Sequence, residues 1–189
     1  MLMKSESFLL DKKMSSEKVS IYKNKKFTLE FKFKHLDFYN EIYYLRKIKK
    51  FDLLLSNVKK YTNLFLEKKK LNFSILLTND NEIKEINQKY RNINKPTNVL
   101  SFKSVIDEKS YFRNTKQEIY IGEIIISMER IFNESKINNV LFRDHFIHIF
   151  LHAILHIFGY DHEIDSERKK MEDIEILILK NLGIRNPYA

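Results

Sequence analysis

The sequence HFIHIFLHAILHIFGYDH, residues 145–162, holds five of the six histidines of this 189-residue chain. His152 and His156 stand four residues apart in an apolar run that predicts a helix, so their imidazoles leave the same face about one turn apart. Gly159 then predicts a reversal of the chain, because glycine readily adopts positive φ. The reversal would bring His162 back toward the pair, and the stretch therefore predicts a point where three histidines meet.

Three neutral imidazoles suit zinc or a related first-row ion, and a site with three protein ligands keeps a fourth position for water. We expect one Zn²⁺ per chain, in a catalytic rather than a structural role. The same histidine and glycine spacing occurs in the metzincin peptidases, where a glutamate general base follows the first histidine. Here that residue is Ala153, which disfavours peptide hydrolysis. The alternative, a core helix with hydrogen-bonded imidazoles, is less consistent with three histidines at ligand spacing.

The length and composition indicate one cytoplasmic domain. The chain has no cysteine, which excludes disulfides and thiolate metal sites and agrees with a reducing compartment. No apolar run reaches the roughly 18 residues of a membrane span, and the first residues are too charged for a secretory signal. We expect no membrane partner and no dinucleotide cofactor, and the sequence leaves the oligomeric state open.

The formal charge of +9 is concentrated at the start of the chain. Residues 1–70 contain 18 Lys and Arg against 8 Asp and Glu, whereas residues 71–189 contain 16 against 17. A basic segment attracts phosphates without regard to sequence. A general bias toward Lys, Ile and Asn explains the same pattern, so the charge alone favours nucleic acid only modestly.

Hydrophobic periodicity predicts strands that alternate with helices in a single domain over residues 27–189. Residues 1–26 show no sustained period, and they are interpreted either as a flexible extension or as an artefact of the assumed translation start. Residues 103–118 are predicted to be a surface loop. The predicted strands are 27–33, 73–77, 99–102 and 120–127. The predicted helices are 38–68 (one helix, or two with a break near Phe51), 79–90, 128–135, 139–158 and 166–182.

Two cations lie close together in the sequence before the third predicted strand. Arg91 ends a predicted helix and Lys95 follows in a loop with Pro96. Arginine can bind phosphate oxygens in a bidentate fork, which lysine cannot. A cation at a helix C-terminus is also favoured by the helix dipole, and on local evidence alone this second interpretation is preferred.

Three other residues are candidates for supporting roles. His148 lies one turn before His152, about 6 Å along the axis, where it could touch substrate or shuttle protons but is too far to be a fourth ligand. Glu123 lies in an apolar strand and needs a partner, which the second nitrogen of a ligand imidazole could supply. Asp161 could orient a ligand, although acidic residues are also common in turns.

Several segments together resemble one family. They are Tyr90-Arg91, Lys95 to Phe102, Gly122 to Ile124, His145 to His148, His152 to His162, and the ending Leu182-Gly183 with Asn186 to Tyr188. In these segments the sequence resembles YbeY, the single-strand-specific endoribonuclease of bacterial ribosomal RNA maturation. The family usually has Gly at Ala153, Asp at Glu123 and often Pro at Lys103.

The resemblance implies an α+β fold, with a four-stranded mixed β-sheet and about five or six helices. It also implies zinc held by His152, His156 and His162, with Arg91 as the catalytic or RNA-contacting cation. The expected function is metal-dependent hydrolysis of RNA phosphodiesters in ribosomal RNA maturation, at the 3′ end of the small-subunit RNA, and in ribosome quality control. The expected partners are ribosomal RNA and the small ribosomal subunit.

Two questions stay open at this point. The general base is a metal hydroxide or His148, unless the neighbouring ribose 2′-hydroxyl acts as the nucleophile. The alternative function is a ribosome assembly factor that binds RNA without cutting it and uses the metal only to stabilise the fold.

Overall fold

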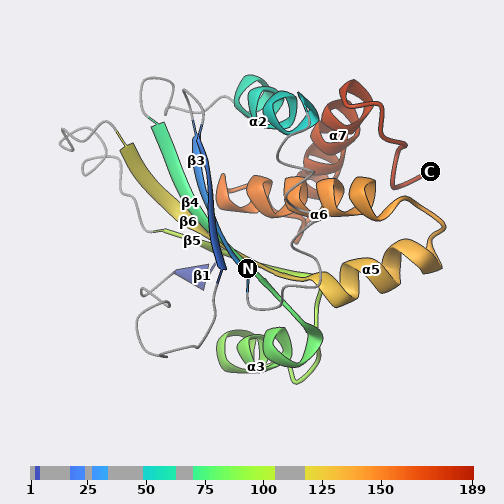
Figure 1. Cartoon of the computed structure of the whole chain (residues 1–189). Helices are drawn as coiled ribbons and strands as arrows, with labels where there is room; N and C mark the ends of the chain where they lie inside the picture. Colours follow the sequence, from blue (N-terminus) through green and yellow to red (C-terminus); the bar gives the residue numbers. More distant parts are fainter. Residues whose placement is uncertain (1–2, 5–17, 24–26, 34–48, 63–69, 105–117) are drawn as a thin grey trace.

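The chain folds into a six-stranded mixed sheet with helices on both faces (Figure 1). The computed structural model describes residues 3–4, 18–23, 27–33, 49–62, 70–104 and 118–189. The strands are β1 Met3–Lys4, β2 Lys18–Lys23, β3 Phe27–Phe33, β4 Lys70–Thr78, β5 Val99–Lys103 and β6 Glu118–Ser127. The described helices are α2 Lys49–Tyr61, α3 Asp80–Arg91, α5 Met128–Ile137, α6 Phe142–Ile157 and α7 Asp165–Asn181. The sheet order is β1-β5-β6-β4-β3-β2.

The predicted α+β class and mixed sheet are confirmed. The four predicted strands are β3 to β6, and they are the four adjacent central strands of the sheet. Two further strands come from the predicted extension, since β2 pairs antiparallel with β3 and β1 pairs parallel with β5. The described part of the predicted helix 38–68 is α2. The predicted loop 103–118 lies mostly outside the described residues.

The main core lies between one face of the sheet and helices α2, α5, α6 and α7 (Figure 1). Alternate residues of β4 point into it, as a strand with one face on a core requires, and these are Leu71, Phe73, Ile75 and Leu77. A second cluster on the opposite face packs under α3 and consists of Ile83, Leu100, Phe102 and Ile125. Among the described helices, four therefore cover one face of the sheet and α3 covers the other.

Helix α6 is the central element of the main core. Nine of its residues are buried, namely Phe146, Ile147, Ile149, Phe150, Leu151, Ala153, Ile154, Leu155 and Ile157. A helix that is apolar around most of its circumference is stable only when neighbouring elements surround it. Its histidines occupy the positions that the core leaves partly open, and His148, His152 and His156 are all half-buried.

A bulge in β6 sets which residues face α6. Opposite the step from Asn72 to Phe73 in β4, strand β6 advances from Tyr120 to Gly122. Gly122 has φ +150°, and a Cβ there would clash with the backbone carbonyl oxygen of Phe102 on β5. Only glycine permits this approach of the two backbones. Beyond the bulge, Ile124 points into the main core and Ile125 into the cluster under α3.

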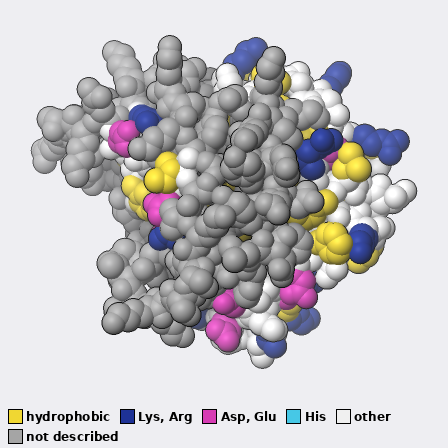
Figure 2. Space-filling model, viewed as in Figure 1, with side chains coloured by type: hydrophobic (Ala, Val, Ile, Leu, Met, Phe, Trp, Pro, Cys, Tyr) yellow, Lys and Arg dark blue, Asp and Glu magenta, His cyan; other side chains and the backbone are white. Residues whose placement is uncertain are grey.

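The described surface carries charges of both signs. On the face shown in Figure 2, Lys and Arg side chains lie mainly along the upper and right edges, and Asp and Glu side chains appear between and below them. Within the described segments no helix is by itself long and apolar enough to cross a bilayer, although α5 and α6, bent by 120° between them, pass that test as a pair.

We expect Gly122→Ala to destabilise the fold far more than Gly183→Ala. Both glycines have positive φ, but a Cβ at Gly183 would meet nothing within 4 Å. Gly183→Ala should therefore cost about 1 kcal/mol for backbone strain alone. Gly122→Ala should cost about 3 kcal/mol or more, because the backbone of β5 must move. Urea unfolding of both variants measures the difference, and equal losses would contradict the close approach of β5 and β6.

Candidate metal centre

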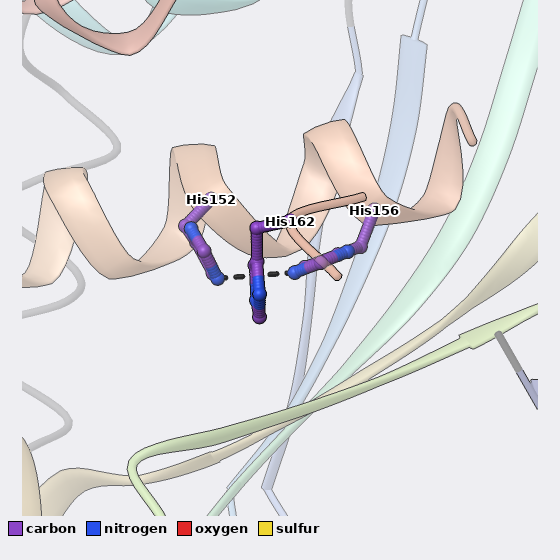
Figure 3. A group of neighbouring side chains, drawn as sticks. All are labelled: His152, His156 and His162. Carbon is purple, nitrogen blue, oxygen red and sulfur yellow. Dashed lines mark hydrogen bonds between the residues drawn. The ribbon is translucent and has the colours of Figure 1, made fainter. Parts of the chain in front are cut away.

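Three imidazoles meet at the end of α6 (Figure 3). His152 and His156 project from the last two turns of the helix, and His162 returns from the turn that follows. One ring nitrogen from each residue lies within 4.8 Å of the other two. The ring centroids are 4.6 Å apart for His152 and His156 and 4.9 Å apart for His156 and His162. The predicted convergence of the three histidines is thus present in the structure.

The turn depends on Gly159, which has φ +89°. The amide of Gly159 donates to the carbonyl of His156 at 2.9 Å, and the amide of Tyr160 donates to the carbonyl of Leu155 at 3.0 Å, so two carbonyls in the last turn of α6 are satisfied. After the turn, the Asp161 carboxylate accepts a hydrogen bond from the backbone amide of His162 at 2.8 Å. Asp161 therefore fixes the backbone of a candidate ligand.

Hydrogen bonds at Nδ1 fix the tautomers of two of these rings. His152 Nδ1 is 2.8 Å from a Glu175 carboxylate oxygen, and His156 Nδ1 is 3.0 Å from the carbonyl oxygen of Tyr160. Both partners are acceptors, so each Nδ1 carries a hydrogen and donates it. In a neutral ring of this tautomer, Nε2 then carries no hydrogen and has a free lone pair. The outer-shell contacts thus leave both Nε2 atoms ready to bind a cation.

The two Nε2 atoms are 3.1 Å apart, a contact marked in Figure 3. Since neither neutral ring has a hydrogen at Nε2, this contact cannot be an ordinary hydrogen bond between them, and two facing lone pairs repel unless a cation lies between. An ion about 2.1 Å from each nitrogen in tetrahedral geometry needs nitrogens about 3.4 Å apart. Small side-chain shifts bring the three rings to that spacing, so the donor set fits a zinc-like ion.

Glu175 is a functional residue that the sequence analysis missed. It lies on α7 and is fully buried, with 0% exposure. Oε1 accepts from His152 Nδ1, Tyr188 Oη donates to Oε2, and His148 Nε2 is 3.4 Å from Oε2. A signal for it exists in the sequence, because Glu175 lies four residues after Met171 and three before Ile178, on the apolar face of the last helix.

The pKa values of this cluster follow from burial and hydrogen bonding. Burial acts to raise the pKa of Glu175, but hydrogen bonds from His148, His152 and Tyr188 outweigh it and lower that pKa to about 2. Burial lowers the pKa of His156 to about 4, and repulsion from His152 and His162 adds to this effect. At neutral pH the cluster therefore combines an ionised carboxylate with a neutral His156.

Arg91 lies at the same pocket as the histidines. A pocket of about 260 Å³ opens between β5 with its preceding loop and the end of α6. Its lining consists of Arg91, the stretch 97–102, His152, His156, Asp161 and His162. Arg91 is the last residue of α3 and is exposed. Helix α3 and the turn after α6 thus bring a guanidinium and three imidazoles to one opening.

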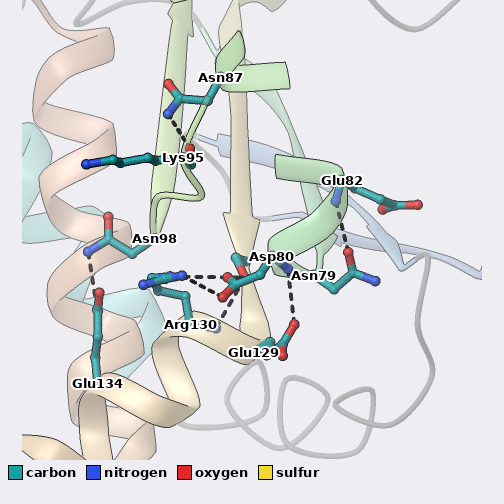
Figure 4. A network of polar contacts seen from close by, with 10 residues as sticks. Asn79, Asp80, Glu82, Asn87, Lys95, Asn98, Glu129, Arg130 and Glu134 are labelled. Atoms are coloured by element: carbon teal, nitrogen blue, oxygen red, sulfur yellow. Dashed lines mark hydrogen bonds and ion pairs between the residues drawn. The ribbon is translucent and has the colours of Figure 1, made fainter. Parts of the chain in front are cut away.

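The loop after α3 is tied down on both sides (Figure 4). Asn87, which is 2% exposed, donates from Nδ2 to the carbonyl oxygen of Lys95 at 2.7 Å. Asn98 donates from Nδ2 to Glu134 at 3.2 Å, and its carbonyl oxygen accepts from the Ser127 amide at 3.0 Å. These contacts hold the loop against α3 and α5. These hydrogen bonds therefore fix the backbone that follows Arg91, near the end of α6.

The start of α3 is anchored to α5 by a bidentate ion pair (Figure 4). Arg130 donates from Nε at 3.2 Å and from Nη2 at 2.7 Å to the two oxygens of Asp80. Asn79 caps the same helix by accepting from the amide of Glu82 at 3.0 Å. Both ends of α3 are fixed, so the helix is a rigid support for Arg91.

Three predicted supporting residues lie elsewhere. Lys95 is exposed and does not line the pocket. His148 faces Glu175 and borders a second cavity, which is also lined by residues 138–141 and 184–187. Glu123 accepts from Tyr120 Oη at 2.9 Å rather than from a ligand imidazole. Two residues before Ile125, it points to the face of the sheet under α3, away from α6. The carboxylate partner of a ligand imidazole is Glu175 instead.

The chain is similar to endoribonucleases over most of its length. The family model described as Endoribonuclease YbeY matches residues 39–183. Endoribonuclease YbeY of Neorickettsia sennetsu is 40% identical over 142 residues, which are 74% of this chain and 90% of that protein. Endoribonuclease YbeY of Anaplasma phagocytophilum is 42% identical over 115 residues, 61% of this chain and 70% of that protein. The solution structure of TM1509 from Thermotoga maritima aligns with 19% identity and a TM-score of 0.47, covering 85% of this chain and 99% of that one.

We expect zinc to stabilise the wild-type protein and His162→Ala to abolish this effect. A ligand at 100 times its Kd adds about 2.7 kcal/mol to the free energy of unfolding. His162 is exposed in the turn, so its removal should change the metal-free stability by only about 0.5 kcal/mol. Thermal melts with zinc and with chelator measure both quantities.

The matched control is His145→Ala, which removes an imidazole bonded to Glu134 at 2.8 Å and outside the cluster. This variant should melt earlier than the wild type yet keep the full stabilisation by zinc. If His162→Ala were stabilised by zinc as much as the wild type, the three-histidine site would be wrong.

Proposed function

The chain belongs to the YbeY family of endoribonucleases, and from this we propose that it hydrolyses phosphodiester bonds of single-stranded RNA with a zinc ion held by His152, His156 and His162. The single observation that carries the zinc proposal is the approach of the His152 and His156 Nε2 atoms to 3.1 Å beside a third imidazole. Three neutral protein ligands leave a coordination position for water or substrate.

Bound zinc would supply a water whose pKa is lowered to about 7 and would polarise a phosphoryl oxygen. The residues of the chain provide the remaining parts of the site. The three histidines would hold the ion, and Glu175 and the Tyr160 carbonyl accept hydrogen bonds that orient two of the rings. Asp161 keeps the backbone of His162 in place.

Arg91 is the proposed phosphate-binding cation. Arg91 lines the same pocket as the three histidines, and no ion-pair partner is found for it among the described residues. A planar guanidinium can donate two parallel hydrogen bonds to a phosphate. It would orient the scissile group and stabilise the charge that develops on it in the transition state.

Two positions that bear on the general base, Ala153 and His148, do not line the pocket of the histidines. Ala153 is fully buried in the main core, so the position that carries the base in metzincin peptidases has neither a carboxylate nor access to the pocket. His148 contacts Glu175 and does not line this pocket. A water in the metal site and the neighbouring ribose 2′-hydroxyl are the two candidate nucleophiles. A metal-bound hydroxide would already have lost its proton, whereas the 2′-hydroxyl would have to give its proton to a base, for which a metal-bound hydroxide is the candidate.

We place the substrate among ribosomal RNAs, with action at the 3′ end of the small-subunit RNA and in ribosome quality control in the cytoplasm. The resemblance of Arg91, the Lys95 to Phe102 segment and the histidine segment to the family supports this assignment. A basic balance in residues 1–70 agrees with an RNA partner.

We predict that Arg91→Glu lowers the rate of RNA cleavage about 10²–10³-fold, the usual effect of removing one donor that stabilises a transition-state charge. Arg91→Lys should fall between this variant and the wild type, because lysine keeps the charge and loses the fork. His156→Ala should be inactive. The assay uses a single-stranded RNA with the 3′-terminal sequence of small-subunit ribosomal RNA, and the duplex of the same sequence, with zinc or chelator.

The matched control is Lys180→Glu, the same reversal of charge at an exposed position on α7, which should cut as the wild type does. Thermal melts of each variant would test whether it is folded. Full activity of Arg91→Glu would remove Arg91 from the mechanism. Binding of RNA by the wild type without metal-dependent cutting would favour the assembly factor with a structural metal.

A further inference from the structure

We propose that Glu175 is a positioning residue that fixes the metal ligand His152, and that Tyr188 in the C-terminal segment holds Glu175 in place. The inference rests on the proposed metal site and goes beyond it, because it assigns a role in metal binding to α7 and to the last residues of the chain. Neither residue touches the pocket that contains the histidines.

Glu175 is placed where a carboxylate needs several donors. It is 0% exposed, and an ionised group without water is stable only when hydrogen bonds replace its hydration. Three side chains supply them, from α6 and from the C-terminal segment. An apolar residue at this position would pack in the core more simply. The burial of a charge here therefore points to a role for that charge.

The two oxygens of Glu175 have separate partners. Oε1 accepts from His152 Nδ1 at 2.8 Å, whereas Oε2 accepts from Tyr188 Oη and lies 3.4 Å from His148 Nε2. A rotation of the carboxylate would break the contacts of both oxygens together. Tyr188 and His148 thus keep Oε1 pointed at His152, and the His152 ring keeps its Nε2 pointed at His156 and His162.

The contact also makes the candidate ligands unequal. His152 donates to a carboxylate, whereas His156 donates to the neutral carbonyl of Tyr160. A carboxylate that accepts a hydrogen bond from Nδ1 makes Nε2 of the same ring a stronger ligand for a metal. Carboxylates in this position commonly contribute 10- to 100-fold to metal affinity. His152 is therefore the ligand whose bond to the ion depends most on a distant residue.

Tyr188 belongs to a segment that packs against α6 after α7 has ended. Its ring stands edge-on to His148, with centroids 5.7 Å apart and an interplanar angle of 87°. Residues 184–187 and Ala189 form one wall of the second cavity, of about 920 Å³, while His145 and His148 lie on the other. The C-terminal segment thus reaches the metal site through one hydroxyl group, the one bonded to Glu175.

The test compares zinc affinity, by competition with a chelator, and the visible absorption of bound Co²⁺, which reports ligand geometry. Glu175→Gln should bind zinc about 10- to 100-fold more weakly and shift the Co²⁺ band. Tyr188→Phe should weaken zinc binding in the same direction by less. Each variant has a control, Asp173→Asn for a charge on the exposed side of α7 and Tyr120→Phe for a hydroxyl bonded to Glu123 under the other face of the sheet. Both controls should match the wild type.

The outcomes separate this inference from the proposed metal site. If the wild type binds neither zinc nor Co²⁺, the metal site itself is wrong. If the wild type binds them and both Glu175→Gln and Tyr188→Phe keep its affinity and spectrum, the positioning role is wrong while the site stands. Should Glu175→Gln fail to fold, Tyr188→Phe decides alone, because it removes one oxygen atom at a half-exposed position.

Discussion

The Nε2 atoms of His152 and His156 lie 3.1 Å apart at the end of α6, and hydrogen bonds from neighbouring elements hold both rings there. Each ring is held by a hydrogen bond from Nδ1 to an acceptor, one on α7 and one in the turn after Gly159. Because both acceptors bind hydrogens, neither ring can turn its hydrogen toward the other without losing a buried hydrogen bond. The repulsion between the lone pairs is a cost that a cation removes, so the folded protein has a preformed place for positive charge.

The rest of the pocket depends on how the layers of the domain meet. Helix α6 lies on one face of the sheet and α3 on the other, and the loop after α3 passes around the end of the sheet into β5. Arg91 and the histidines therefore come from opposite faces and meet where this loop passes the end of α6. The hydrogen bonds of Asn87 and Asn98 fix the loop at that crossing. The site is a product of the fold, and no single element contains it.

Local chemistry was enough to predict that His152, His156 and His162 meet. The spacing of His152 and His156, with a glycine before His162, determines a geometry that any helix followed by a reversal would share. The four central strands were also predictable, because each has a clear apolar pattern. Glu175 was missed although its place on the apolar face of α7 is visible in the sequence. The reason is that tertiary packing decides which donors reach a buried carboxylate, and the sequence does not show this packing. A ligand imidazole was offered as one possible partner of Glu123, because the sequence does not tell which face of the sheet a strand residue occupies beyond the bulge at Gly122.

The proposed role of Glu175 makes the docking of the last helix and the occupancy of the histidine site two sides of one equilibrium. A ligand that binds better when α7 is docked must, by linkage, favour the docked state by the same factor. The amide hydrogens of α7 and of the C-terminal segment are far in sequence from His152, yet their exchange with solvent deuterium would slow when the ion binds. The end of the chain is thus a natural reporter of metal occupancy.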